Sequence, residues 1–208
     1  DAYHSGESVV DLVLKTDANI IFKGGGKPYF MTEYGGSPFG NSIPALEADL
    51  HCGIWSSYMT HSAGTPYFWW FDLIDQEDWY HHFKALAAFH KGEERLAAKR
   101  LSRRASTTSN SRIRSLAYGS DERGYAWVYH YKTLRELQRS ANDRNAGVVL
   151  YITGLKGDDY SYEIWDTFTG EMIEKGDTVM ETQRGLSRMR IKLPAFRSDI
   201  AVKYYEKK

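Results

Sequence analysis

The sequence predicts an α/β region followed by an all-β domain: the last two β/α units of a TIM-type (β/α)8 barrel, then an antiparallel β-sandwich. Two observations predict the first part. Apolar runs end in polar or aromatic residues at Glu33 and at Trp69 to Asp72, and an amphipathic stretch lies between them. A third predicts the second part, because in residues 111–208 the apolar residues alternate with polar ones, as they do in strands.

Three segments of the first part have the apolar spacing of helices. Residues 8–22 place Val9, Leu12 and Val13 on one face. A second helix is predicted from Ser42, with one continuous apolar face made by Leu46, Leu50, Ile54 and Tyr58. The apolar spacing in residues 79–90 predicts a third helix. Pro28 and Gly64 begin the two strands that end at Glu33 and Asp72.

The character of the sequence changes after residue 93. Residues 94–110 pass from charged to Ser/Thr-rich composition, which predicts a linker between domain 1–93 and domain 111–208. In domain 111–208, strands are expected near 113–118, 124–131 and 147–153. Three more strands are expected where apolar residues alternate with polar ones: at Tyr160, Tyr162 and Ile164; at Met189, Ile191 and Leu193; and at Ile200, Val202 and Tyr204. Short strands at this spacing are typical of a β-sandwich.

The composition excludes several classes of partner. The 27 basic and 27 acidic residues give a net charge of zero, so no overall field favours nucleic acid or an anionic membrane surface. No apolar run has the length of a membrane span, and no signal peptide is visible. The single cysteine, Cys52, excludes an internal disulfide and a cysteine metal cluster.

Glu33 is the first candidate for chemistry. It directly follows an apolar run, and an unpaired carboxylate in a core is costly. One interpretation is a solvated residue that begins a loop. The other is a functional group, because active sites of (β/α)8 barrels lie at the C-terminal ends of the strands.

The Trp-rich strand end supplies candidates for ligand binding. Side chains alternate along a strand, so Trp69 and Trp70 point to opposite sides. Trp70 shares its predicted face with Asp72 and is therefore favoured as the ring that faces a ligand, although both rings can also be core residues. Asp72 and Asp75 can bind hydroxyl groups or cap the next helix.

The histidines, the known catalytic motifs and the basic residues give no further candidate site. No histidine has metal-ligand spacing with a carboxylate partner, so the sequence predicts no metal site. A nucleophile elbow and a P-loop are both lacking, and no cofactor is predicted. The basic group Lys99, Arg100, Arg103 and Arg104 has no interleaved aromatic residues and is interpreted as a solvated linker.

The sequence resembles a family in segments that span nearly its whole length. The segments are Lys27-Pro28, Glu33-Tyr-Gly-Gly36, residues 48–57, Ala63-Gly-Thr-Pro66, Trp69-Trp-Phe-Asp72, residues 162–171 and residues 199–203. They resemble the C-terminal part of cellulase-like glycoside hydrolases, of the retaining (β/α)8 clan that includes family 5, with an attached β-sandwich domain.

The resemblance implies a retaining hydrolase that acts on a poly- or oligosaccharide. Glu33, at the end of the seventh barrel strand, would be the catalytic nucleophile. Trp70, Trp69, Asp72 and Tyr34 would bind substrate near the end of the eighth. The family also implies a secreted or periplasmic location.

One feature of the family is missing. Its acid/base carboxylate comes from the fourth barrel strand, and this chain supplies only about two of the barrel's units. The expected partner is therefore the N-terminal part of the barrel, and the chain alone is expected to be inactive. The alternative is a non-catalytic sandwich, which either binds carbohydrate through Trp165, Tyr160 or Tyr162 or only covers barrel surface.

Overall fold

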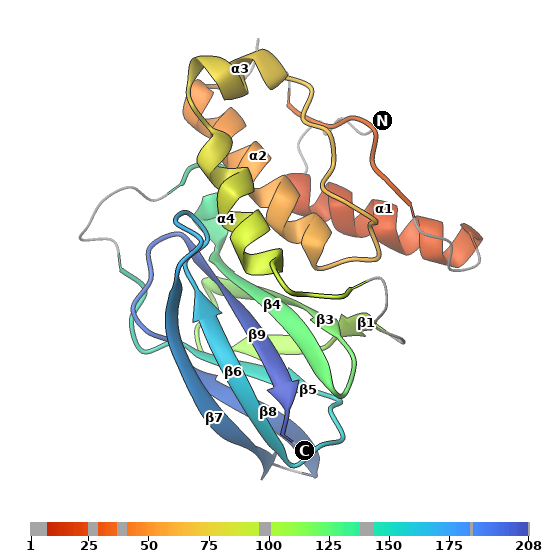
Figure 1. Ribbon diagram of the computed structural model, residues 1–208, viewed down its shortest axis with the longest axis vertical. Helices are drawn as coiled ribbons and strands as arrows, with labels where there is room; N and C mark the ends of the chain where they lie inside the picture. The colour runs from red at the N-terminus through yellow and green to blue at the C-terminus, as the bar shows by residue number, and fades with distance from the viewer. Residues whose placement is uncertain are drawn as a thin grey trace.

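The computed structural model describes residues 8–24, 29–36, 41–95, 101–137, 144–183 and 185–207. Its first part contains the helices α1 (Val9–Gly24), α2 (Ile43–Tyr58), α3 (Phe71–Gln76) and α4 (Tyr80–His90). Its second part contains β1 (Ser102–Arg104), β2 (Ser106–Thr108), β3 (Ile113–Gly119), β4 (Arg123–His130), η1 (Tyr131–Leu134), β5 (Val149–Thr153), β6 (Asp159–Trp165), β7 (Met172–Gln183), β8 (Leu186–Lys192) and β9 (Asp199–Glu206). The helices lie at one end of the sandwich and the C-terminus lies at the other (Figure 1).

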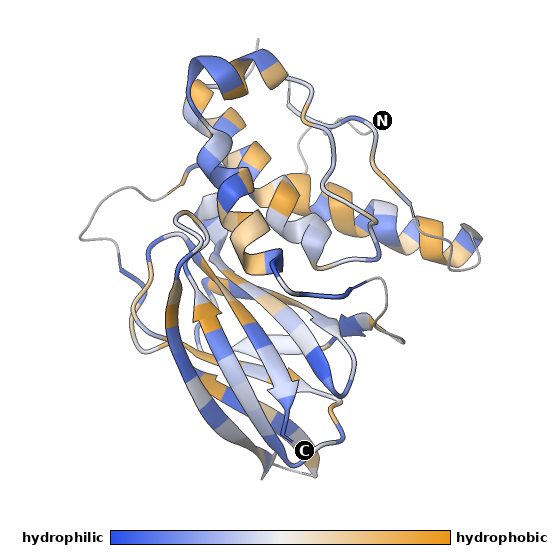
Figure 2. Cartoon of the chain, in the orientation of Figure 1, coloured by the Kyte–Doolittle hydropathy of each residue, from blue (hydrophilic) through white to orange (hydrophobic). Residues whose placement is uncertain are grey.

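The strands form two antiparallel sheets, so the predicted β-sandwich is confirmed. One sheet has the order β1-β3-β4-β9-β6-β7, and the other has the order β7-β8-β5-β2. Residues 172–179 of β7 pair with β6 and residues 180–183 pair with β8, so this strand belongs to both sheets. Polar and apolar residues alternate along several of the strands (Figure 2).

Residues 102–108 belong to the sandwich, although they fall in the segment that the sequence assigns to a linker. β1 pairs with β3 of one sheet and β2 pairs with β5 of the other, so this short segment crosses between the two sheets. Its Ser/Thr side chains suit a sheet edge: the Ser106 and Ser115 hydroxyls are 2.9 Å apart.

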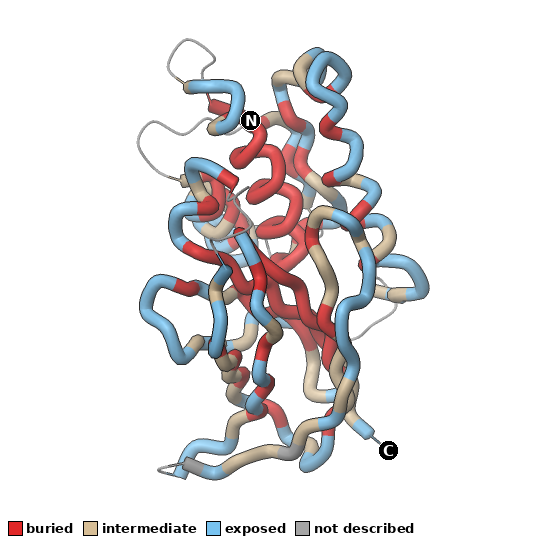
Figure 3. Tube along the Cα trace, turned by 90° about the vertical axis from the view of Figure 1, so that its left-hand side faces the viewer, coloured by how far each residue is buried: buried red, intermediate tan, exposed pale blue. Residues whose placement is uncertain are grey.

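α2 is the central helix and is buried more completely than its sequence predicts. Every residue from Leu46 to Tyr58 is buried rather than one face alone (Figure 3). The helix contacts α1, α4 and η1, so its polar residues are buried with its apolar ones. None of the helices in the described ranges is long and apolar enough to cross a membrane.

The core consists of two clusters separated by one sheet. Ala126 and Val128 of β4 belong to the cluster between the two sheets. Tyr125, Trp127 and Tyr129, which alternate with them, belong to the cluster that includes the helices. β4 is therefore buried on both faces, because the helices cover the outer face of its sheet.

Glu93, just after α4, joins the helices to the sandwich through a buried ionic network. Its side chain is 4% exposed and accepts hydrogen bonds from Lys203 (2.9 Å), Tyr125 (2.8 Å), Tyr205 (2.8 Å) and Arg123. Burial by itself raises the pKa of Glu93, but the hydrogen bonds from Lys203, Tyr205 and Tyr125 outweigh it and hold the pKa below its usual value.

Candidate functional site

Two extended segments of the first part lie side by side and parallel. Isolated parallel bridges join Tyr29 to Ser62 and Tyr34 to Phe68. The Tyr34 amide donates to the carbonyl of Tyr67 at 3.0 Å, and the Trp69 amide donates to the carbonyl of Tyr34 at 2.8 Å. The two predicted barrel strands thus pair as neighbours, but through isolated bridges rather than a regular ladder.

The parallel pairing brings the two predicted strand ends together. Glu33 precedes Tyr34, whose bridge partner Phe68 precedes Trp69 and Trp70. Glu33 is partly exposed, and none of the described residues forms a hydrogen bond or ion pair with its carboxylate.

Trp70 lies against the loop that follows Glu33. Its indole Nε1 donates to the carbonyl of Gly36 at 2.5 Å. A Cβ placed on Gly35, where φ is +145°, would lie 3.3 Å from the Trp70 ring. Glycine at this position therefore lets the loop approach the ring closely. The Trp69 side chain is 43% exposed.

Tyr34 occupies a different environment from the other candidates. Its ring is fully buried, its hydroxyl donates to the carbonyl of Leu50 at 3.1 Å, and a Cβ on Gly53 would lie 2.4 Å from the ring. In this structure Tyr34 therefore packs the segment against α2, and its side chain has no surface free for a ligand.

Asp72 is exposed in the first turn of α3, a helix that the sequence analysis does not predict. α3 begins at Phe71, so the strand alternation assumed for Trp70 and Asp72 does not continue past Trp70. A carboxylate in the first turn of a helix interacts favourably with the helix dipole.

A buried polar chain, which the sequence pattern did not predict, links α2, α4 and β9. We call it the histidine cluster: Glu47, His51, His82 and Asp199. The Nε2 of His51 is 2.8 Å from Oδ2 of Asp199, and its Nδ1 is 2.9 Å from Nδ1 of His82. The Nε2 of His82 lies 3.4 Å from Oε1 of Glu47.

Aromatic side chains contact the histidine cluster, and burial keeps one of its histidines neutral. The His51 ring stacks on Phe168, with centroids 4.5 Å apart, and the Trp127 indole donates to Asp199 Oδ2 at 2.5 Å. Burial, with smaller contributions from His51 and His81, lowers the pKa of His82 to about 2. His82 is therefore neutral at physiological pH.

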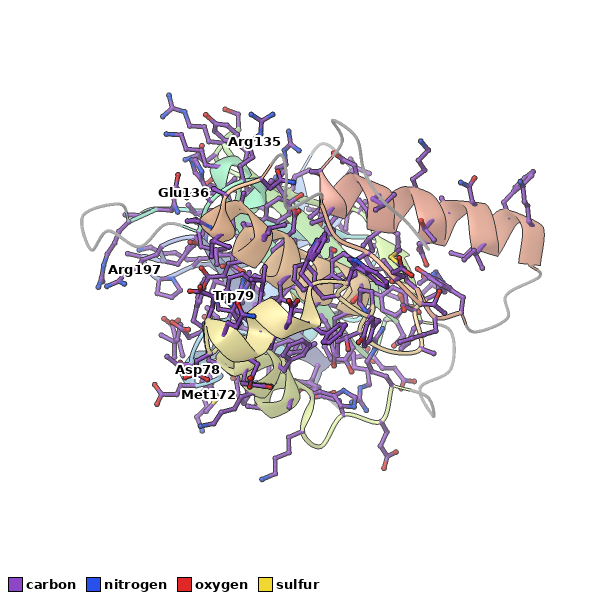
Figure 4. All side chains as sticks on the ribbon, turned by 90° about the horizontal axis from the view of Figure 1, so that it is seen from above. Asp78, Trp79, Arg135, Glu136, Met172 and Arg197 are labelled. Atoms are coloured by element: carbon purple, nitrogen blue, oxygen red, sulfur yellow. The ribbon has the colours of Figure 1, made fainter. Side chains whose placement is uncertain are left out.

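A cavity of about 950 Å³ opens beside the histidine cluster, between the helices and the sandwich. Its polar lining includes Glu47, His81, Asp166 and Asp199. Trp79 and Arg197, which also line it, lie on the same side of the molecule when viewed from above (Figure 4). The predicted site at Glu33 and Trp70 does not line this cavity, so the chain presents two separate polar regions.

The comparisons with known proteins give structural similarities only. No protein-family model and no curated protein matches the chain. It is similar to a GH30 endoxylanase from Clostridium papyrosolvens C71, at 16% identity and a TM-score of 0.48, over 99% of this chain and 48% of that one. It is also similar to alpha-L-fucosidase isoenzyme 2 from Paenibacillus thiaminolyticus, at 8% identity and a TM-score of 0.30, over 65% of this chain and 18% of that one. At these identities and TM-scores, the similarities assign neither a family nor a function.

Proposed function

We propose that this chain is the C-terminal part of a retaining glycoside hydrolase that acts on a poly- or oligosaccharide. The parallel pairing of segments 29–34 and 62–68 carries the proposal. It brings Glu33, Trp69 and Trp70 to the same end of two neighbouring segments. In a (β/α)8 barrel, that end of the strands holds the active site.

Glu33 is proposed as the nucleophile. Its carboxylate oxygen attacks the anomeric carbon, the glycosidic bond breaks, and a glycosyl ester forms that water then hydrolyses with retention of configuration. A second carboxyl group, about 5–5.5 Å away, must protonate the leaving oxygen and later activate the water. We assign this acid/base group to the part of the barrel that this chain does not supply.

Trp70 and Trp69 are proposed to bind the sugar beside Glu33. The flat face of an indole packs against the apolar C–H face of a sugar ring, while the hydroxyl groups remain free to bind polar groups. The hydrogen bond from Trp70 to Gly36 fixes the orientation of its ring relative to the loop that follows Glu33. We assign no ligand contact to Tyr34, whose ring is buried.

The proposed partner is the remainder of the barrel. Within the described residues, each of the two paired segments has one extended neighbour, whereas a strand in a closed barrel has two. Large aromatic side chains near these segments are exposed, among them Phe30 (52%), Tyr67 and Phe71 (57%). Such clustered apolar exposure is typical of a surface that another part of a protein covers.

The sandwich is proposed to be structural rather than carbohydrate-binding. Of the three rings expected to bind sugar, Tyr160 is fully buried and Trp165 is half-buried against the core that includes the helices. The aromatic residues of β4 belong to the same core and pack against the helices. The observed packing therefore favours a domain that supports the helical part.

The test uses an enzyme assembled from this chain and the polypeptide that supplies the other barrel strands. A 2-fluoro glycoside with a dinitrophenolate leaving group traps a glycosyl ester, and such a leaving group departs without an acid catalyst. We expect one label per chain, on the peptide that contains Glu33, and none in Glu33→Gln. Glu77→Gln, an exposed control, should label like the wild type. A label on another residue, or turnover retained by Glu33→Gln, would refute the assignment.

A further inference from the structure

One carboxylate and two histidines close to the cavity can together hold a metal ion. Glu47 comes from α2, and His81 and His82 come from the first turn of α4. One ligand atom from each residue lies within 4.8 Å of the others. Their separation along the chain explains why their sequence spacing did not predict a site.

The hydrogen bonds of the histidine cluster determine which nitrogen of His82 is unprotonated. The Asp199 carboxylate accepts from Nε2 of His51, so the Nδ1 of a neutral His51 is an acceptor. When His51 is in this neutral form, His82 donates from its own Nδ1, over the 2.9 Å that separates the two atoms. The Nε2 of neutral His82 then carries a lone pair that faces Glu47.

This lone pair has no partner among the described residues. The Nε2 of His82 is buried, forms no hydrogen bond, and lies 3.4 Å from Oε1 of Glu47. A lone pair and a carboxylate oxygen repel each other at this distance, unless a proton or a cation lies between them. Two ligands about 2.0–2.1 Å from one tetrahedral ion are roughly 3.4 Å apart, which matches the observed separation.

His81 is oriented in the same way by its own hydrogen bond. Its Nδ1 lies 3.2 Å from the carbonyl oxygen of Asp78, which can only accept, so the proton is on Nδ1 and the Nε2 lone pair is free. Histidine ligands of metal ions almost always donate their second ring N–H to a carbonyl or a carboxylate. His81 does so directly, and His82 does so through His51 to Asp199.

We propose that Glu47, His81 and His82 bind one zinc ion. Two histidines and one glutamate are a known ligand set for zinc with an open fourth position. Glu47 and His81 line the cavity of about 950 Å³, from which a water molecule can reach that position. The ion joins α2 to α4 and, through His51 and Asp199, to β9. It therefore stabilises the junction of the helices and the sandwich.

The test is calorimetric titration of the chelator-treated 208-residue chain with zinc chloride, with thermal unfolding in parallel. We expect one ion per chain and a higher melting temperature. His81 is exposed, so His81→Gln should fold normally yet lose at least about 100-fold in zinc affinity, the upper end of the loss seen for second-shell changes. His90→Gln changes an exposed histidine on the same helix and should bind zinc like the wild type.

Two results would overturn the proposal. One is no heat of binding and no change in melting temperature with equimolar zinc. The other is unchanged zinc affinity in both His81→Gln and Glu47→Gln, with their secondary structure preserved by circular dichroism. Magnesium chloride, tested in the same way, should not raise the melting temperature, because a site with two imidazole ligands disfavours that ion.

Discussion

The Glu93 network offers the sharpest test of what attaches the helices to the sandwich. Glu93→Gln keeps the shape of the side chain but removes its charge. Lys203, whose side chain is also 4% exposed, then loses the carboxylate oxygen 2.9 Å from its ammonium group. Two tyrosine hydroxyls and Arg123 lose a charged acceptor as well.

The expected loss follows from the burial of both partners. Breaking a buried ion pair by removing one partner costs about 3–5 kcal/mol, because the other charge is left uncompensated. At about 2–4 °C per kcal/mol for a chain of this size, the melting temperature should fall by roughly 6–20 °C. Glu94→Gln, a change at the exposed neighbour, should alter the free energy of unfolding by less than about 0.5 kcal/mol.

The measurement is urea unfolding followed by circular dichroism and by tryptophan fluorescence. The double variant Glu93→Gln with Lys203→Met should recover part of the loss, because replacing a buried pair with apolar groups is often neutral. A loss below about 1 kcal/mol in Glu93→Gln, as for exposed pairs, would refute the network as the junction. Equal losses in the single and double variants would show that Lys203 is not the main partner.

Because the pKa of folded Glu93 lies below its usual value, its contribution to stability is complete above about pH 5 and is lost as pH falls; acid should therefore destabilise the wild type more than Glu93→Gln in urea melts. Gly53→Ala places a Cβ 2.4 Å from the Tyr34 ring and should cost about 1–3 kcal/mol by overpacking, and a neutral effect on urea unfolding would contradict this contact. Trp70→Phe removes the hydrogen bond to Gly36 and should therefore cost about 0.5–1.5 kcal/mol of stability. It should also raise the KM of the assembled enzyme for its sugar, and an unchanged KM would count against a sugar-binding role.

The sequence by itself determined the local elements and the division into a helical part and a sandwich. Apolar spacing predicted α1, α2, α4 and most of the strands, because that spacing reflects which side of each element is buried. It missed α3, which has only six residues, and it named no range for β7, which changes its pairing partner midway. It also placed β1 and β2 in a linker, because their polar residues lie at a sheet edge.

Only the tertiary structure decided which polar groups meet. His51 and Asp199 are 148 positions apart, and Glu93 meets Lys203 because β9 is added to the sheet next to β4. Local periodicity contains no information about strand order, nor about which face of a sheet the helices cover. β4 is thus buried on both faces, Tyr34 is turned into the core, and Glu47 faces two histidines of another helix. Each outcome is set by packing between distant segments, which a local pattern in the sequence does not specify.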